Sequence, residues 1–246
     1  MISTFSITAR DERTGMLGVA VSTAVPAVGA LCPFVKAGVG AVATQAFVNY
    51  AFGPRGLELL ERGVRADKAV ETLIRADPGG EQRQLSIVDA NGGAASHTGS
   101  ACTAWAGHQI GDGVAVAGNM LVGEATLAAM LRVYQQYEGD DFVERLMQAL
   151  EAGQAAGGDL RGRQSAALKV AYEEDVAYCD LRVDEHRDPV SELRRIVEVA
   201  RIQLFPFVHA LPKQTDPLGT AAAEIRSLLR LAPGERSATN LEPTSD

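Results

Sequence analysis

The chain opens with alternating hydroxyl and apolar side chains. The hydroxyl residues Thr4, Ser6 and Thr8 are each followed by an apolar residue, and this period of two places the three hydroxyl groups on one face of a strand. Residues 11–15 form a polar segment that ends in glycine, and residues 17–22 then alternate in the same way. The pattern predicts a β-hairpin that begins almost at the first residue.

Beyond this hairpin, short apolar segments alternate with segments of helical period. Strands are predicted at residues 39–47, 84–90, 94–98, 114–120, 165–172 and 176–183. Helices are predicted at residues 56–62, from Asp67 as a cap to Pro78, around 127–134 and 143–150, from Asp188 as a cap to 204, and at 219–231. Residues 24–33 are predicted to be a loop or a broken strand, and residues 153–162 a loop.

The order of these elements favours an α+β fold. Pairs of helices lie between groups of mostly antiparallel strands, which predicts four layers in the order helix, sheet, sheet, helix (αββα). The chain has no evident linker, so we expect one domain over residues 1–231. The segment 232–246 contains proline, serine, threonine and glutamate, and we expect it to be disordered.

Composition narrows the possible partners. The net charge is −8 and the isoelectric point is near 5.1, which argues against nucleic acid and favours a small-molecule or peptide substrate. The cysteines Cys32, Cys102 and Cys179 are odd in number and widely spaced, so we expect reduced thiols and no metal site. The sequence has neither a membrane-spanning apolar run nor a signal peptide, so we expect a cytoplasmic protein without a membrane partner. We also expect no cofactor.

Thr4 is the first candidate for chemistry. A hydroxyl residue at the start of a core strand is where an amino-terminal-nucleophile hydrolase carries its nucleophile, because a free α-amine can act as its base. Methionine aminopeptidase removes Met1 only before small residues, and Ile2 follows here. Exposing Thr4 would therefore require cleavage after Ser3 or a different start site. In the alternative interpretation, Thr4 is only a residue that favours β-structure.

The second candidate is a polar face on the strand near residue 180. Alternation places Asp180, Arg182, Asp184 and His186 together, where they could bind a polar substrate, hold a metal or supply acid and base. Only three of these groups can ligate a metal, so the ligand set is incomplete. The alternative is a solvent-facing strand with paired charges.

Further candidates are single residues and one loop. Gly157–Ala167 combines glycines with two arginines but lacks the ending of a P-loop, so it is either a ligand loop or a flexible connector. Asn119 could donate a hydrogen bond to an oxyanion or cap the backbone. Gln45 ends a predicted strand. Lys36 could lower the pKa of a nucleophile nearby or be simply exposed.

Many ordered motifs together resemble the bacterial domain-of-unknown-function 1028 family. They are Thr4–Ile7, Gly38–Ala46, Gly53–Leu57, Arg83-Gln84, His97–Gly99, Trp105–Gly107, Gly118-Asn119, Gly157–Gly162 with Gln164–Leu168, and Asp180–Asp184 with His186. The resemblance covers about residues 3–205. It implies a fold similar to the amino-terminal-nucleophile (Ntn) hydrolases, the αββα arrangement of the proteasome β subunit, and no settled activity.

The resemblance also implies roles for two residues. In the wider superfamily the first strand carries the nucleophile, and Thr4 occupies that place here. Family members commonly start Met-Thr-Phe-Ser, whereas this chain inserts Ile2-Ser3. Lys36 matches, in position only, the lysine that proteasome-like members place beside the nucleophile.

The leading hypothesis is an amide hydrolase acting on a small polar molecule or peptide. Thr4 is its nucleophile, Asn119 stabilises the oxyanion, and Gln45 and the face near residue 180 bind substrate. One alternative is a ligand-binding or scaffold protein that keeps the fold without catalysis. Another is metal-dependent hydrolysis on the Asp180–His186 strand. Layered folds often pair through helices, which suggests a homodimer.

Overall fold

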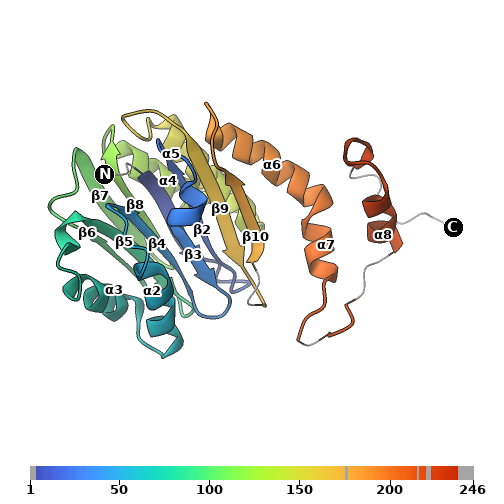
Figure 1. Ribbon diagram of the computed structural model, residues 1–246, viewed down its shortest axis with the longest axis horizontal. Helices are drawn as coiled ribbons and strands as arrows, with labels where there is room; N and C mark the ends of the chain where they lie inside the picture. Colours follow the sequence, from blue (N-terminus) through green and yellow to red (C-terminus); the bar gives the residue numbers. More distant parts are fainter. Residues whose placement is uncertain (1–3, 175–176, 215, 220–222, 238–246) are drawn as a thin grey trace. The chain divides into compact units, whose positions relative to one another are not determined.

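A computed structural model describes residues 4–174, 177–214, 216–219 and 223–237 (Figure 1). The chain divides into two compact units, one that ends at Leu193 and one that begins at Arg194. Within the described ranges, no helix combines the length and the apolar composition that crossing a membrane would require. The expectation of a single domain over residues 1–231 stays a prediction.

The first unit contains a six-stranded antiparallel sheet with β1 in its interior. Its strands are β1 (Thr4–Arg10), β2 (Leu17–Thr23), β7 (Trp105–Gly111), β8 (Val114–Leu121), β9 (Ser165–Ala171) and β10 (Ala177–Val183), in the order β10-β9-β2-β1-β8-β7. The predicted hairpin is present, and Thr4 lies opposite Thr23 on β2 and Asn119 on β8. The first residue of β1 is therefore flanked on both sides.

A second, four-stranded antiparallel sheet packs against the first. Its strands are β3 (Pro33–Lys36), β4 (Gly40–Ala46), β5 (Arg83–Asp89) and β6 (Ala94–Thr98), in that order. Val21 of the larger sheet shares one buried apolar cluster with Ala41 and Ala43 of β4. Small side chains on β4 let the two sheets approach closely.

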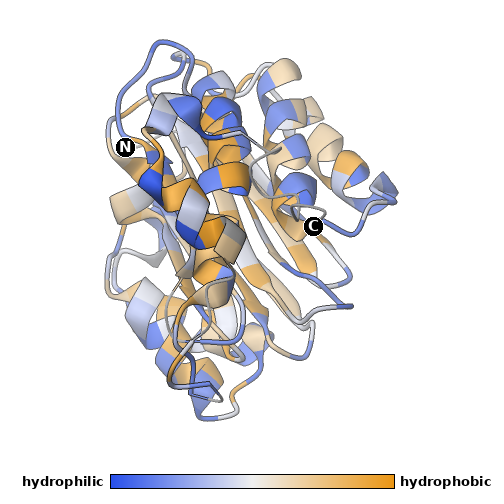
Figure 2. Ribbon diagram, turned by 90° about the vertical axis from the view of Figure 1, so that its right-hand side faces the viewer, coloured by the Kyte–Doolittle hydropathy of each residue, from blue (hydrophilic) through white to orange (hydrophobic). Residues whose placement is uncertain are grey.

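Four helices cover the outer faces of the two sheets. The four-stranded sheet contacts α2 (Phe52–Glu61) and α3 (Ala66–Arg75), and the six-stranded sheet contacts α4 (Ala125–Gln136) and α5 (Phe142–Ala155) (Figure 1). In Figure 2 the helices carry both apolar and polar residues, as expected for helices with one side against a sheet. The first unit is thus a mixed α/β structure with two antiparallel sheets.

The remaining helices are shorter or lie near the boundary between the units. They are α1 (Val28–Leu31), α6 (Pro189–Gln203), α7 (Phe205–Ala210) and α8 (Ala223–Arg230), with 3-10 turns at Gly80–Gln82 and Pro233–Glu235. The last turn lies within the segment that was expected to be disordered, and residues 238–246 lie outside the described residues.

Three local predictions were wrong for identifiable reasons. β7 was not predicted, because its edge position leaves every residue at least partly exposed and the strand lacks the apolar run that marks a buried strand. The segment expected to be a loop before residue 33 contains α1. α2 begins at Phe52 rather than residue 56, since Pro54 lies in the first turn, where its missing N–H is not needed.

Two helix ends also differ from prediction. Asp67 lies inside the first turn of α3 rather than at its cap, and the N–H of Ala66 is instead bound by the Asp89 carboxylate at 3.0 Å. α5 continues to Ala155 and includes Gly153, which was expected in a loop. A side chain at Gly153 would lie within 2.7 Å of Met130, so the glycine permits close packing of α4 and α5.

Candidate functional site

Thr4 is buried at the start of β1, with its hydroxyl group between the two sheets. Its side chain is 1% exposed, and Oγ1 donates a hydrogen bond to Thr23 Oγ1 at 3.3 Å. Ser6, two residues along, lies opposite Val21, whose side chain packs against the second sheet. The predicted hydroxyl face is therefore confirmed. Among the described residues, the hydroxyl groups of Ser6 and Thr8 are buried without a hydrogen-bond partner.

Three buried amide side chains form a network beside Thr4. Gln84 Oε1 accepts hydrogen bonds from Gln45 Nε2 at 2.7 Å and from Asn119 Nδ2 at 3.0 Å. Gln45 and Gln84 face each other across the β4–β5 ladder, while Asn119 comes from the other sheet and lies opposite Thr4. The network therefore joins the two sheets at the end where β1 begins, and it includes two predicted site residues.

The network continues through Gln84 to an imidazole at the surface. Gln84 Nε2 lies 2.8 Å from Thr98 Oγ1 and 2.8 Å from the Gly118 carbonyl oxygen. Thr98 Oγ1 lies 2.9 Å from His108 Nδ1. If Gln84 donates to the Thr98 hydroxyl, that hydroxyl donates to His108, whose proton then resides on Nε2. Partial burial lowers the pKa of His108, which favours this neutral form.

The backbone is left-handed immediately after two of the amides. Ala46, which follows Gln45, has φ 66°, and Met120, which follows Asn119, has φ 50°. Non-glycine residues rarely adopt this conformation, and such residues concentrate at functional sites. β4 therefore ends at a strained residue next to the network, and β8 has one at its penultimate position.

Ala46→Gly is expected to be far less harmful than Ala43→Gly. Both alanines are 1% exposed on β4, but only Ala46 has a positive φ, where glycine removes a penalty of about 1–2 kcal/mol. Ala43 gains no such relief and bears the usual entropic cost of glycine. Urea denaturation should show the Ala46→Gly variant as the more stable by about 1–2 kcal/mol. Equal losses in the two variants would contradict the strain.

A glycine-rich loop closes the end of β1. The Gly158 carbonyl accepts a hydrogen bond from Val122 N, and Leu160 N donates to the Met120 carbonyl at the end of β8. On the other side, the Asp159 carboxylate accepts from Ala24 N at 2.9 Å, just after β2. Asp159 is 5% exposed and pairs with Arg161 at 3.2 Å. The loop thus connects β8 and β2, the two neighbours of β1, at the end where β1 begins with Thr4.

An ion pair supports the residues that follow the network. Asp77 Oδ2 accepts from Arg83 Nε at 2.8 Å and from Asn49 Nδ2 at 2.9 Å. Arg83 also donates to the carbonyl of Phe47 and lies over its ring, 5.2 Å from the centroid. Arg83 chiefly, with Asn49 and a backbone N–H, holds the pKa of Asp77 well below its usual range.

The Asp77→Asn variant is expected to lose stability only above the acid range. The pKa of Asp77 is lower in the folded state, so its stabilisation is complete above the ordinary value of 3.8 and is lost as pH falls through the folded value. Urea denaturation should show a deficit of about 2 kcal/mol at pH 7 that shrinks steadily below pH 3.8. A deficit that does not depend on pH would contradict this assignment.

The polar face on β10 is present but lies away from Thr4. Asp180 and Arg182 are exposed while Leu181 between them is buried, and Asp180 pairs with Lys169 at 3.0 Å. Arg182 lies in the same row as Ser6, three strands away, or about 14 Å at the usual strand spacing. His186 Nδ1 accepts from the N–H of Asp188, and Asp184 is exposed.

The structure does not assemble two of the predicted arrangements. Lys36 Nζ forms an ion pair with Glu61 at 2.6 Å. Lys36 lies opposite Gly40 on β4, and Gly40 is five positions from Gln45, so Lys36 is roughly 16 Å from the network. The lysine is therefore not beside Thr4. In the described part of the chain, no group of three or more histidine, cysteine, aspartate or glutamate side chains could hold a metal ion, so Asp184 and His186 do not form such a centre.

Three residues of this region were missed as site candidates. Gln84 and Asp159 occur within the motifs that resemble the family, and His108 was not selected as a candidate. Gln84 is polar but is the first residue of a predicted core strand, and a buried amide needs hydrogen-bond partners. The polar residue in a core strand could have been noticed in the sequence, but the partners of Gln84 on four other strands could not.

Comparison with solved structures identifies a protein of the same fold. The crystal structure of protein SPO2555 from Silicibacter pomeroyi, a DUF1028 protein, superposes with a TM-score of 0.82. Its sequence is 29% identical, and the match covers 89% of this chain and 96% of that one.

Two proteasome-like proteins are far more distant. Anbu (ancestral beta-subunit) from Yersinia bercovieri matches with a TM-score of 0.37 and 12% identity, over 85% of this chain and 98% of that one. A mutant of Anbu from Hyphomicrobium sp. strain MC1 matches with a TM-score of 0.35 and 11% identity, over 82% of this chain and 96% of that one. Similarity at this level carries no argument about function.

The family model agrees with the extent of the first unit. No curated protein matches the sequence. The model of a family of unknown function, DUF1028, matches residues 4–193, from the first residue of β1 to the end of the first compact unit. This chain belongs to the DUF1028 family.

Proposed function

We propose that the protein is an Ntn-type hydrolase that cleaves an amide bond in a small polar molecule or peptide. The observation that carries this proposal is the position of Thr4, whose buried hydroxyl group lies at the start of a central strand between Thr23 and Asn119. Helices on the outer face of each sheet support the four-layer αββα fold of that superfamily as part of the proposal.

The proposed first reaction removes residues 1–3. Thr4 Oγ1 attacks the carbonyl carbon of Ser3, the Ser3–Thr4 C–N bond breaks, and the hydroxyl proton passes to the Thr4 nitrogen. Water then hydrolyses the resulting ester. This step releases a tripeptide with a new carboxylate, and it restores the Thr4 hydroxyl group beside a free α-amine.

The proposed second reaction uses that amine as a base. It accepts the proton of Thr4 Oγ1 as the oxygen attacks the substrate carbonyl, and it returns a proton to the nitrogen that leaves when the substrate C–N bond breaks. Water then hydrolyses the acyl ester on Thr4, which releases the acid product and restores the hydroxyl group. Asn119 is the proposed oxyanion donor, since it lies opposite Thr4 and its amide orientation is fixed by Gln84. Gln45 holds Gln84 from the other sheet.

Other parts of the proposal concern substrate and assembly. Asp180 and Arg182 on β10, with Asp184 and His186 just after the strand, are the proposed contact for the polar end of a substrate long enough to span about three strands. A homodimer and a cytoplasmic location also belong to the proposal. Size-exclusion chromatography with light scattering tests the first, and fractionation of the host cell tests the second.

A non-catalytic ligand-binding protein is the second candidate. The observation that favours it is the 1% exposure of Thr4, because a substrate cannot reach a nucleophile that is fully covered. In this case the amide network serves only to join the two sheets.

Intact-mass spectrometry of the protein from its own host distinguishes the two candidates. The hydrolase predicts that residues 1–3 are absent from the wild type, after which amide substrates can be screened with the processed protein. A full-length wild-type chain would contradict the hydrolase and favour the binding protein.

A further inference from the structure

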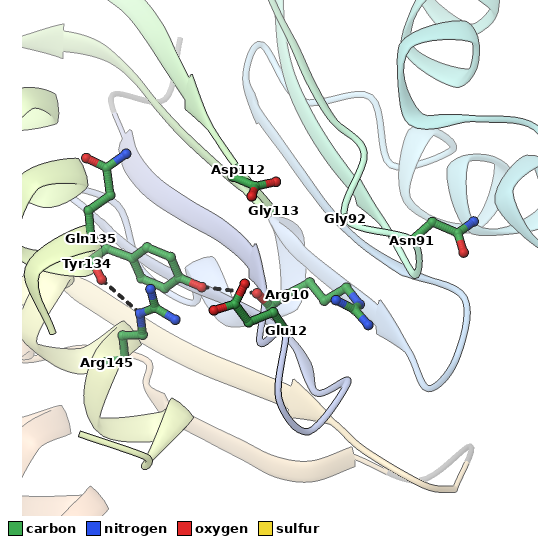
Figure 3. A pocket seen from close by; sticks show the side chains of 9 residues that line it. All are labelled: Arg10, Glu12, Asn91, Gly92, Asp112, Gly113, Tyr134, Gln135 and Arg145. Carbon is green, nitrogen blue, oxygen red and sulfur yellow. Dashed lines mark hydrogen bonds between the residues drawn. The ribbon is translucent and has the colours of Figure 1, made fainter. Parts of the chain in front are cut away.

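A polar pocket lies at the opposite end of β1 from Thr4. It has a volume of about 400 Å³ and is lined by side chains from the hairpin turns of both sheets and from α4 and α5 (Figure 3). Arg10 is the last residue of β1, six positions from Thr4, so the pocket is about 20 Å from the nucleophile. It is therefore separate from the proposed hydrolase site.

One wall of the pocket is fixed by Tyr134 and Arg145. The Tyr134 hydroxyl donates to the carbonyl oxygen of Arg10 at 3.2 Å, and Arg145 Nε donates to the carbonyl oxygen of Tyr134 at 2.8 Å. The guanidinium of Arg145 also lies over the Tyr134 ring, 3.9 Å from its centroid (Figure 3). These contacts hold the α4–α5 side of the pocket rigid before any ligand binds.

The pocket contains charges of both signs that have no partner. Arg10 Nε is buried, and within the described residues the Arg10 side chain has neither a hydrogen bond nor an ion pair. The carboxylates of Glu12 and Asp112 line the same pocket, and among the described residues they likewise have no hydrogen-bond or ion-pair partner. A guanidinium partly removed from water normally gains a carboxylate partner, since its desolvation is otherwise uncompensated.

We propose that this pocket binds a small zwitterion with one carboxylate and one ammonium group, the chemistry of a free amino acid. Arg10 would receive the carboxylate, because its planar guanidinium can donate two parallel hydrogen bonds. Glu12 and Asp112 would receive the ammonium. A phosphate or another dianion is disfavoured by these two carboxylates, while the volume of about 400 Å³ lies in the range of small-molecule sites.

Isothermal titration calorimetry with each of the twenty standard L-amino acids tests the proposal. At least one amino acid should bind with a Kd below about 1 mM. Its amide, which lacks the carboxylate, and its N-acetyl form, which lacks the ammonium, should each bind at least tenfold more weakly, as expected for the loss of one charge-assisted hydrogen bond.

Two variants test which side chain binds the carboxylate of the ligand and which binds its ammonium group. Arg10→Gln should weaken binding of the amino acid at least about tenfold but leave the affinity for its amide unchanged. Asp112→Asn should weaken binding of the amino acid but leave the affinity for its N-acetyl form unchanged. Arg62→Gln, just after α2, is the matched control, since its side chain is 70% exposed, and it should leave the affinity unchanged. Affinity should also be unchanged in Thr4→Ala, so failure of the hydrolase does not affect this test.

Three outcomes would overturn the proposal. They are the absence of binding by all twenty amino acids, equal binding of the N-acetyl form, and unchanged affinity in Arg10→Gln and Asp112→Asn. Among the described residues neither side chain has a partner to lose, so both variants should keep the urea midpoint of the wild type. If Arg10→Gln does not fold, Asp112→Asn alone decides between the outcomes.

Discussion

Thr4→Ala is expected to retain residues 1–3, whereas Thr4→Ser is expected to lose them as the wild type does. Serine keeps the hydroxyl group that attacks the Ser3 carbonyl, and alanine removes it. The measurement is intact mass after expression in the native host and again after incubation of each purified chain. Because the Thr4 side chain makes a buried hydrogen bond to Thr23, far-ultraviolet circular dichroism should accompany the masses to show that each variant is folded.

Two further variants separate self-cleavage from cleavage by another enzyme. Ser6→Ala removes the next hydroxyl group on the same face of β1 and should be processed normally. Asp159→Asn weakens the loop that closes the end of β1, and slower processing is expected because Ala24 N loses a charged acceptor. Processing of Thr4→Ala at the wild-type rate would show that a host protease acts and that Thr4 is not the nucleophile in this step.

Gln84→Leu is expected to cost about 3–4 kcal/mol of folding free energy. Leucine has a similar volume, so the loss arises from hydrogen bonds. The amides of Gln45 and Asn119 lose their common acceptor, and the Gly118 carbonyl oxygen loses a donor, all in the interior between the sheets. Each unsatisfied buried group costs about 1–3 kcal/mol, and partial relaxation reduces the sum.

Urea denaturation at constant m-value measures this loss. Gln136→Leu, at an exposed position on α4, is the matched control and should change stability by less than about 0.5 kcal/mol. A loss below about 1 kcal/mol for Gln84→Leu would show that the network is not essential to the contact between the sheets.

Local pattern was sufficient to predict most of the elements. The alternation around Thr4 gave the hairpin and the buried hydroxyl face, and the helical period gave α4 and α5. β7 was missed because an edge strand needs no continuous apolar run. α7 was missed because Leu204 extends the apolar stripe of the preceding helix, whereas the structure ends that helix at Gln203.

The candidate site was only partly predictable, because its contacts join distant segments. Gln45 and Asn119 were selected individually, but the residue that joins them, Gln84, lies 39 and 35 positions away in the sequence. Lys36 was placed near Thr4 by its number alone, and the pairing of β3 with β4 carries it to the other end of the strand. Sequence periodicity determines the face of a side chain but not its partner across a sheet.

The interior position of β1 has a consequence for the entropy of the proposed reaction. Both edges of this strand are bonded along nearly its whole length, to β2 and to β8, so its amides should be among the slowest to exchange with deuterium in the native protein. A chain terminus at Thr4 would therefore not fray as most termini do. The nucleophile would keep its orientation after cleavage, and the cost of fixing it would already be met by folding.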